Sequence, residues 1–283
     1  MVLLADKLFV MKMKPLLAAL LLMMSSSLAL AAETQFLQGL GDTQYRHIAS
    51  KHVGRGYHIY VSLPNGYEES EETYPTLYVL DGGELFPMLT SYHRYLSFGE
   101  GLPKVIIVGI SYGSDNFENG NFRSTDFTAP SNERDFWGGA ARFKKFLSDE
   151  LFPLIESDYR SRSDRRIIFG HSIGGQFVLF AAQTDPGLFW GAIASNAALH
   201  RNLDFFLQSP PNTDDNSETR LFVGNAINDD PTFLEPRARW IERWTNQLEK
   251  PFELRVADLE GHTHMSAPPA AYLEGMRWLF PAN

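Results

Sequence analysis

The chain of 283 residues contains no cysteine. It can therefore form no disulfide, no thiolate nucleophile, no iron–sulfur site and no cysteine-ligated zinc site. The sequence also lacks an excess of basic charge, because 25 Lys and Arg residues stand against 34 Asp and Glu residues, a formal net charge of −9. Binding to nucleic-acid phosphates needs a basic face, so we expect no nucleic-acid partner.

The rest of the composition is that of an ordinary globular protein. Hydrophobic residues make up 44% and charged residues 21% of the chain, which excludes a disordered, collagen-like or coiled-coil protein. The sequence has no internal repeat and no long low-complexity linker, and the turn-rich stretch 209–217 predicts a surface loop.

The first 31 residues have the pattern of a secretory signal peptide. Lys12 and Lys14 precede the apolar run 16–24, and the small-residue stretch 29–32 follows it. The run is too short for a membrane span, although an uncleaved anchor is the alternative interpretation. We therefore expect a signal peptide over residues 1–31, one domain over residues 32–283, and export to a bacterial periplasm or to the medium without stable membrane insertion.

The mature sequence predicts a mostly parallel sheet covered by helices on both faces. A hairpin is expected at 45–50 and 57–63, and short continuous apolar runs follow, as strands buried on both faces require. These runs are residues 76–80, 105–110, 166–169, 192–195, 221–223 and 252–256. Helical patterns lie at residues 86–98, 140–155, 174–184, 235–248 and 270–280. In such an α/β fold the ligand crevice lies beyond the carboxyl ends of the strands.

The sharpest local motif is Gly170-His171-Ser172-Ile173-Gly174, a G-x-S-x-G sequence between a predicted strand and a predicted helix. This context defines the nucleophile elbow of the α/β-hydrolase fold, in which a strained turn exposes the serine hydroxyl above the sheet. Glycine is needed on both sides because side chains there would collide. The motif predicts Ser172 as a nucleophile, and a serine in an ordinary tight turn is the alternative.

A serine nucleophile needs a base, and in this fold the chain order is serine, acid, histidine. His262 and His264 both follow the last predicted strand and compete for the role. His171 is expected to pack or donate locally. The remaining histidines are expected at the surface: His47, His52, His58, His93 and His200.

The acid is expected after the strand 221–223, where Asp229 and Asp230 are the candidates and Glu235 is less favoured. Its role would be to hold the imidazole tautomer and stabilise the imidazolium. Asp-Asp-Pro before a helix is also good capping chemistry, so the acid stays open here. The oxyanion hole needs two backbone donors, for which we expect Ile173 and either Gly82 or Gly83, with Gly83 preferred.

These residues resemble the esterase-D-like branch of the α/β-hydrolases, which contains enterochelin (siderophore) esterases, feruloyl esterases and mycolyltransferases. The resemblance covers nearly all of the mature chain, and it rests on the elbow and on the following segments: 61–67, 78–82, 121–130, 138–140 and 264–266. The resemblance implies a serine ester hydrolase. It favours His264 over His262, because the histidine of this family stands immediately before Met-Ser.

The resemblance also bears on the substrate. Siderophore esterases commonly hold an anionic ligand with basic residues, which makes Arg123 a candidate substrate-binding residue, although Arg123 and Asp126 could instead pair and stiffen their loop. The chain has Ser195-Asn196-Ala197 where the family often has Ser-Pro, so the identity of the substrate is open. Some relatives use a Ser–His dyad without a clear acid.

We therefore predict an exported serine esterase in which Ser172, His264 and Asp229 act on a small-molecule ester. No cofactor is required, and no metal is expected because His262 and His264 have no third ligand at a recognisable spacing. An acyltransferase with the same triad is one alternative. A non-catalytic binding protein of the same fold is another, although its hallmark, loss of the serine or histidine, is missing.

Overall fold

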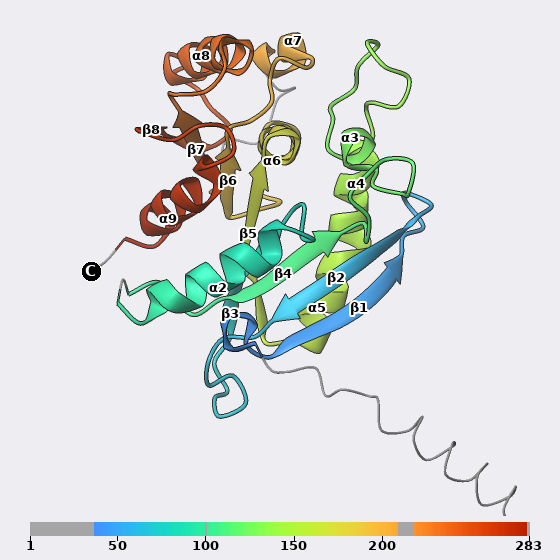
Figure 1. The fold of residues 1–283 in the computed structure, drawn as a ribbon, viewed down its shortest axis with the longest axis vertical. Coiled ribbons are helices and arrows are strands. Elements are labelled where there is room, and N and C mark those ends of the chain that lie inside the picture. Colours follow the sequence, from blue (N-terminus) through green and yellow to red (C-terminus); the bar gives the residue numbers. More distant parts are fainter. Residues whose placement is uncertain (1–36, 100, 209–217, 282–283) are drawn as a thin grey trace, which may run out of the picture. The chain divides into compact units, whose positions relative to one another are not determined.

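The centre of the protein is an eight-stranded sheet (Figure 1). The structure, a computed structural model, describes residues 37–99, 101–208 and 218–281, so the predicted signal peptide and the predicted loop 209–217 lie outside the described residues. The strands are β1 (Thr43–Ala49), β2 (Gly56–Ser62), β3 (Tyr74–Val79), β4 (Ile106–Ser111), β5 (Ser161–His171), β6 (Gly191–Ser195), β7 (Arg220–Ala226) and β8 (Glu253–Leu259).

The strand order is β1-β2-β4-β3-β5-β6-β7-β8. β2 pairs antiparallel with β1 and β4, and every pair from β4 through β3 to β8 is parallel. Because parallel strands end at one edge, the loops after β3, β5, β7 and β8 meet at the same side of the sheet. The α/β-hydrolase fold predicted from the sequence is confirmed.

The sheet separates two hydrophobic cores. In β5, Ile168 belongs to one core while its neighbours Ile167 and Phe169 belong to the other. β4 divides in the same way, with Val108 in the first core and Ile107 in the second. Alternate side chains of a strand point to opposite faces, and a strand apolar at every position therefore needs cover on both sides.

Helices supply this cover (Figure 1). On one face lie α2 (Leu85–Ser97) and α9 (Ala267–Leu279). The other face is covered by α4 (Ala140–Phe146), α5 (Phe152–Asp158), α6 (Ile173–Thr184), α7 (Leu203–Leu207) and α8 (Pro231–Thr245). A short helix η1 (Gln38–Leu40) precedes β1, and α3 (Arg123–Asp126) follows β4. The sequence did not predict α3 and α7, which have only four and five residues.

The helix predicted over residues 140–155 is divided by a wider turn. The π-helical segment η2 (Leu147–Leu151) connects α4 to α5, and the Phe152 N–H bonds to the Leu147 carbonyl oxygen. Pro153 follows at the start of α5. Proline has no N–H to donate, and its ring crowds the carbonyl four residues earlier, so a regular α-helix cannot pass through it undisturbed.

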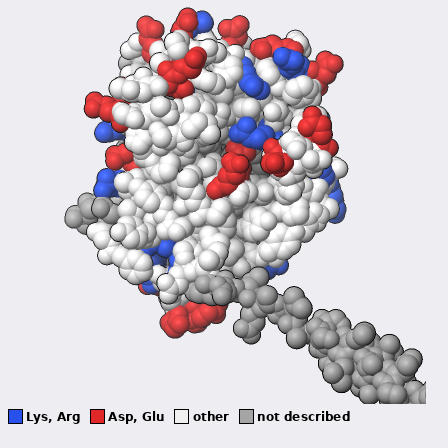
Figure 2. All heavy atoms as spheres, in the orientation of Figure 1, with Lys and Arg blue, Asp and Glu red and all other residues white. Residues whose placement is uncertain are grey.

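Within the described residues, no helix is long and apolar enough to cross a membrane. On the face drawn in Figure 2, Lys and Arg side chains lie among Asp and Glu side chains and form no continuous basic stripe. This distribution agrees with the acidic net charge and does not favour nucleic-acid binding on that face.

A buried carboxylate ties the first hairpin to α3. Asp126 is 1% exposed and accepts hydrogen bonds from Tyr57 Oη at 2.7 Å and Tyr112 Oη at 3.0 Å. It also forms an ion pair with Arg55, from the turn between β1 and β2. A buried charge is stable only when its partners satisfy it, so this group fixes the place of α3.

His93 is buried rather than at the surface, which corrects the prediction. It is 4% exposed on α2, and its Nε2 lies 3.0 Å from the Pro103 carbonyl oxygen. Its Nδ1 lies 2.7 Å from Tyr272 Oη on α9. A carbonyl can only accept, so Nε2 carries the proton and Nδ1 accepts from the tyrosine. Burial lowers the pKa of His93 to about 4, because the charged imidazolium would be desolvated.

We expect His93 to make the protein less stable in acid. The unfolded histidine has a pKa of about 6.5, so between pH 6.5 and 4 the unfolded chain binds the extra proton and stability falls as the pH falls. His93→Gln removes this titration, so urea denaturation should show the wild type losing on the order of 3 kcal/mol more than the variant between pH 7 and 4. The exposed His47→Gln is the control. Parallel pH dependences of wild type and His93→Gln would contradict the assignment.

Candidate active site

Ser172 stands at the junction of β5 and α6 with an unusual backbone. Its φ is 57° and its ψ is −116°, in a region that a residue with a Cβ rarely adopts. Steric exclusion explains the motif around it. A Cβ at Gly170 would lie 2.3 Å from the Gly174 carbonyl oxygen, and one at Gly175 would lie 3.0 Å from the Ser195 carbonyl oxygen. The turn from β5 into α6 has no room for side chains at these two positions, and glycine is the residue that fits.

Backbone hydrogen bonds hold this strained turn. The Ser172 N–H donates to the Ser195 carbonyl oxygen at 2.9 Å, at the end of β6. The Ser172 carbonyl oxygen accepts from Gln176 N–H at 3.0 Å and from Ala198 N–H at 2.9 Å. The loop after β6 is thus attached to the elbow, and surrounding structure fixes a conformation that would be unfavourable alone.

His264 and Asp229 lie together beside the elbow. His264 Nδ1 is 2.9 Å from Asp229 Oδ2, and the two side chains are 16% and 4% exposed. A carboxylate can only accept, so Nδ1 donates and the Nε2 lone pair remains available as a base. The His264 ring packs against Phe233, with centroids 4.5 Å apart, and against His171, with centroids 4.7 Å apart. His264 is therefore held next to the residue that precedes Ser172.

The two candidate acids have different partners. Asp230 is the N-cap of α8, and its Oδ1 accepts from Thr232 N–H at 2.8 Å. Pro231 occupies the first turn, so α8 begins at 231 rather than at the predicted 235. Asp229 faces inward, and its Oδ1 accepts from Asp230 N–H at 2.8 Å. Both functions considered for this loop, capping and contact with histidine, are therefore present, on adjacent residues.

Arg237 is a member of this site that the sequence analysis missed. Its side chain is 1% exposed, and it donates to Asp229 Oδ2 at 2.9 Å, Asn225 Oδ1 at 3.0 Å and the Ala226 carbonyl oxygen at 3.2 Å. It lies on the buried side of α8 together with Trp240 and Trp244. The helical spacing of Arg237, Trp240 and Trp244 could have revealed this residue in the sequence. An arginine on the same helix face as buried tryptophans must have a buried partner for its charge.

These contacts set the charges at the site. Burial raises the pKa of Asp229, but hydrogen bonds from His264, Arg237 and the Asp230 N–H outweigh it and leave the pKa below its ordinary value. Burial, with the positive charge that His264 and Arg123 present, lowers the pKa of His171 to about 3. Asp229 is therefore ionised and His171 neutral at neutral pH.

His262 has a different environment from His264. Its Nδ1 lies 3.1 Å from the Ser266 carbonyl oxygen, a local contact within the same turn. In the described ranges, no group of three or more His, Asp or Glu residues is arranged to hold a metal ion. His200, predicted at the surface, is partly buried and lies edge-on to Phe233 with centroids 4.8 Å apart.

The predicted oxyanion loop lies against the start of α6. A Cβ at Gly174 would lie 3.2 Å from Asp81 Oδ2, so the end of β3 reaches the first turn of the helix that Ile173 begins. The Gly82 N–H donates to the Ile110 carbonyl oxygen at 2.8 Å, and a Cβ there would lie 2.6 Å from Ile110 N. Because the Gly82 amide is already engaged by β4, Gly83 is the better candidate donor.

Arg123 pairs with Asp81, not with Asp126. Its Nε lies 2.7 Å from Asp81 Oδ1 and its Nη2 lies 2.8 Å from Asp81 Oδ2, a two-pronged contact. The suggested Arg123–Asp126 pair is wrong, because Asp126 accepts from Arg55 and two tyrosines instead. Arg123 is 28% exposed, so its role in substrate binding stays a prediction.

An aromatic group lies on the loops around α3. The Phe117 ring packs on Phe122 at 5.1 Å and on Phe136 at 5.5 Å between centroids, and Phe117 and Phe136 are 44% and 42% exposed. Next to Phe136, Trp137 has the Arg201 guanidinium 5.2 Å from its ring centroid. We call Phe117, Phe122, Phe136 and Trp137 the aromatic cluster.

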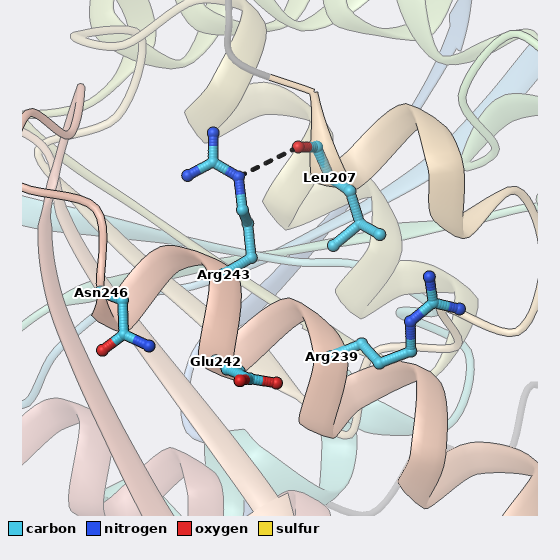
Figure 3. Close-up of a pocket in the computed structure, with 5 residues that line it drawn as sticks. All are labelled: Leu207, Arg239, Glu242, Arg243 and Asn246. Atoms are coloured by element: carbon cyan, nitrogen blue, oxygen red, sulfur yellow. Dashed lines mark hydrogen bonds between the residues drawn. The ribbon is translucent and has the colours of Figure 1, made fainter.

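A surface hollow of about 410 Å³ lies at α7 and α8, and none of the candidate site residues lines it (Figure 3). It is lined by Leu207, Arg239, Glu242, Arg243 and Asn246. The Arg243 Nε donates to the Leu207 carbonyl oxygen at 3.3 Å, which is the dashed contact in the figure. The lining contains no serine, histidine or other nucleophile with a base, so acyl-transfer chemistry has no support there.

Comparison with known proteins places the chain in a family. The sequence profile of a family described as "Putative esterase" matches residues 50–267. Ferri-bacillibactin esterase BesA of Bacillus subtilis is 29% identical over 259 residues, which cover 83% of this chain and 89% of that protein.

Solved structures share the fold of this chain. The BES protein of Bacillus cereus matches with a TM-score of 0.70 at 22% identity, covering 87% of this chain and 97% of that one. An IroE-like serine hydrolase of Shewanella oneidensis matches with a TM-score of 0.69 at 26% identity, covering 84% and 80%. The family that the sequence motifs predicted is thereby confirmed, and the protein is an esterase that belongs to this esterase family of the α/β-hydrolase fold.

Proposed function

We propose that this esterase cleaves carboxylic esters through a covalent acyl-enzyme on Ser172, with His264 as general base and Asp229 as the acid that orients it. The hydrogen bond between His264 Nδ1 and Asp229 Oδ2, 2.9 Å long and beside the elbow, is the main support. It leaves Nε2 as the basic atom of a ring whose orientation Phe233 and His171 fix by packing.

In the first half-reaction, His264 Nε2 takes the proton of Ser172 Oγ while Oγ bonds to the ester carbonyl carbon. The carbonyl oxygen becomes an oxyanion, which the N–H groups of Ile173 and Gly83 stabilise. The tetrahedral intermediate then expels the alcohol, whose oxygen receives the proton from His264 as its bond to carbon breaks. Ser172 is left as an ester of the acid.

In the second half-reaction, water attacks the acyl-enzyme. His264 accepts a proton from the water as its oxygen bonds to the acyl carbon, and returns that proton to Ser172 Oγ as the acid leaves. The sum is one ester and one water converted to one acid and one alcohol. Since both half-reactions use only protein groups and water, no cofactor or metal takes part in this scheme.

For the substrate we propose siderophore-type or other aryl esters. BesA, by its name, acts on ferri-bacillibactin, and two fungal relatives are named siderophore esterases. The aromatic cluster supports this choice because exposed rings can stack on an aromatic group. Arg201, close to Trp137, adds a positive charge suited to an anionic substrate.

We further propose that the protein is exported, with a signal peptide at residues 1–31, a catalytic domain at 32–283, and a periplasmic or secreted location. Support comes from the basic, apolar and small-residue segments of the amino-terminal sequence. The mature protein would then meet its ester substrate outside the cytoplasm.

Hydrolysis of p-nitrophenyl acetate by single variants tests the catalytic assignment. We expect Ser172→Ala to abolish turnover and His264→Ala to lower kcat/KM by about 10⁴-fold, because loss of the base leaves the nucleophile protonated. His262→Ala is the matched control, two positions away, and should stay within a few-fold of wild type. Normal turnover in Ser172→Ala, or the reverse order of the two histidines, would refute the assignment.

The substrate proposal is tested with a cyclic trilactone that carries dihydroxybenzoyl groups. We expect a kcat/KM at least tenfold above that for p-nitrophenyl butyrate, and Phe136→Ala should reduce the value for the lactone alone by about fivefold, as the loss of one aromatic contact allows. Tyr95→Ala, an aromatic that is 77% exposed on α2, is the control. No preference for the lactone would exclude this substrate class.

A further inference from the structure

We infer that Arg123 is a positioning residue that acts through Asp81: it neutralises a carboxylate next to the oxyanion hole and holds the turn that aims the Gly83 amide. This inference rests on the proposed function, since it concerns the oxyanion of that reaction. It differs from the expectation that Arg123 binds the substrate.

Asp81 has a backbone conformation that needs support. Its φ is 53°, in the left-handed region that residues other than glycine rarely occupy. Its carbonyl oxygen accepts from Glu84 N–H at 3.1 Å and Leu85 N–H at 3.0 Å, which starts α2. The peptide units of Gly82 and Gly83 follow directly from this turn, so the conformation of Asp81 decides where the Gly83 N–H points.

The Asp81 side chain also brings charge to the site. Its Oδ2 lies 3.2 Å from where a Cβ of Gly174 would stand, at the first turn of α6 and two residues from Ser172. A negative charge here opposes the negative charge that develops on the ester oxygen, because like charges at short range repel strongly in a partly buried site. The carboxylate is 16% exposed, so water screens it only in part.

One contact from Arg123 both stabilises the turn at Asp81 and offsets the charge of its carboxylate. Its Nε and Nη2 bind the two carboxylate oxygens at 2.7 and 2.8 Å, which cancels the charge and fixes the plane of the Asp81 side chain. α3, which carries Arg123, is itself anchored by the buried Asp126 and its bonds to Tyr57 and Tyr112. The fixed position of α3 therefore keeps the Arg123 guanidinium in contact with Asp81.

A double-mutant cycle on p-nitrophenyl acetate, a neutral ester without an anionic group for arginine to pair with, tests this inference. Arg123→Gln should lower kcat by about 100-fold, comparable to the loss of an oxyanion donor, while KM stays within about threefold. Asp81→Asn removes the charge and keeps a residue that tolerates the left-handed backbone. Arg123→Gln made in the Asp81→Asn background should cost at most about threefold in kcat, and the double variant should be at least tenfold faster than Arg123→Gln alone.

Arg123→Lys and Arg162→Gln complete the design. Arg123→Lys keeps the charge but loses the two-pronged contact, so we expect kcat about tenfold below wild type with KM unchanged, and this variant replaces Arg123→Gln if the latter does not fold. Arg162→Gln, which breaks the exposed pair with Asp164, is the control and should leave kcat and KM at their wild-type values. Far-ultraviolet circular dichroism and thermal unfolding check that each variant is folded.

The outcomes separate this inference from the proposed function. If turnover depends on Ser172 and Arg123→Gln leaves kcat unchanged, or costs as much in the Asp81→Asn background as in wild type, the positioning role is wrong. If Arg123→Gln raises KM for anionic esters and leaves kcat normal, Arg123 binds the substrate instead. If wild type and Ser172→Ala turn over equally, the proposed function itself fails.

Discussion

The turn at Ser172 is the constraint on which the rest of the site depends. β5 can enter α6 at this angle only because Gly170 has no Cβ, which would otherwise lie 2.3 Å from the Gly174 carbonyl oxygen. The serine then takes a left-handed backbone, with φ at 57°, and backbone bonds from the end of β6 hold it. The parallel sheet brings the loops after β3, β7 and β8 to the same edge, so the groups that surround the serine come from distant parts of the chain.

Two carboxylates with arginine partners organise these loops. Asp229 Oδ2 accepts hydrogen bonds from His264 and from the buried Arg237. Asp229 Oδ1 accepts from the Asp230 N–H. Hydrogen bonds from His264 and Arg237 keep the pKa of this acid below its ordinary value although burial opposes them. In the proposed mechanism the ionised acid orients the imidazole. Arg123 holds Asp81, whose carboxylate lies close to Gly174 in the first turn of α6. In the proposed mechanism, Asp229 orients the base, and Asp81 must be neutralised because it lies near the place where negative charge would develop.

The fold and the strained turn at Ser172 were accessible from the sequence because both depend on local pattern. Runs such as 166–169 are apolar at consecutive positions, as a strand buried on both faces requires. The glycines of the elbow motif are required by steric exclusion within the turn itself. Asp229 and Asp230 were not separable, since both are adjacent carboxylates before a helix and only tertiary contacts distinguish the cap from the partner of His264. The Arg123–Asp81 pair joins residues 42 apart, and the burial of His93 depends on α9, so neither could be read from neighbouring residues.

The most direct test of the central claim, that His264 and Asp229 activate Ser172, is covalent labelling with a fluorophosphonate followed by peptide mass spectrometry. The reagent reacts rapidly with an activated serine and slowly with an ordinary hydroxyl. We predict one adduct per chain, on the peptide that contains Ser172, and a labelling rate that falls by orders of magnitude in Asp229→Ala. An unlabelled protein, or an adduct on another serine, would contradict the account.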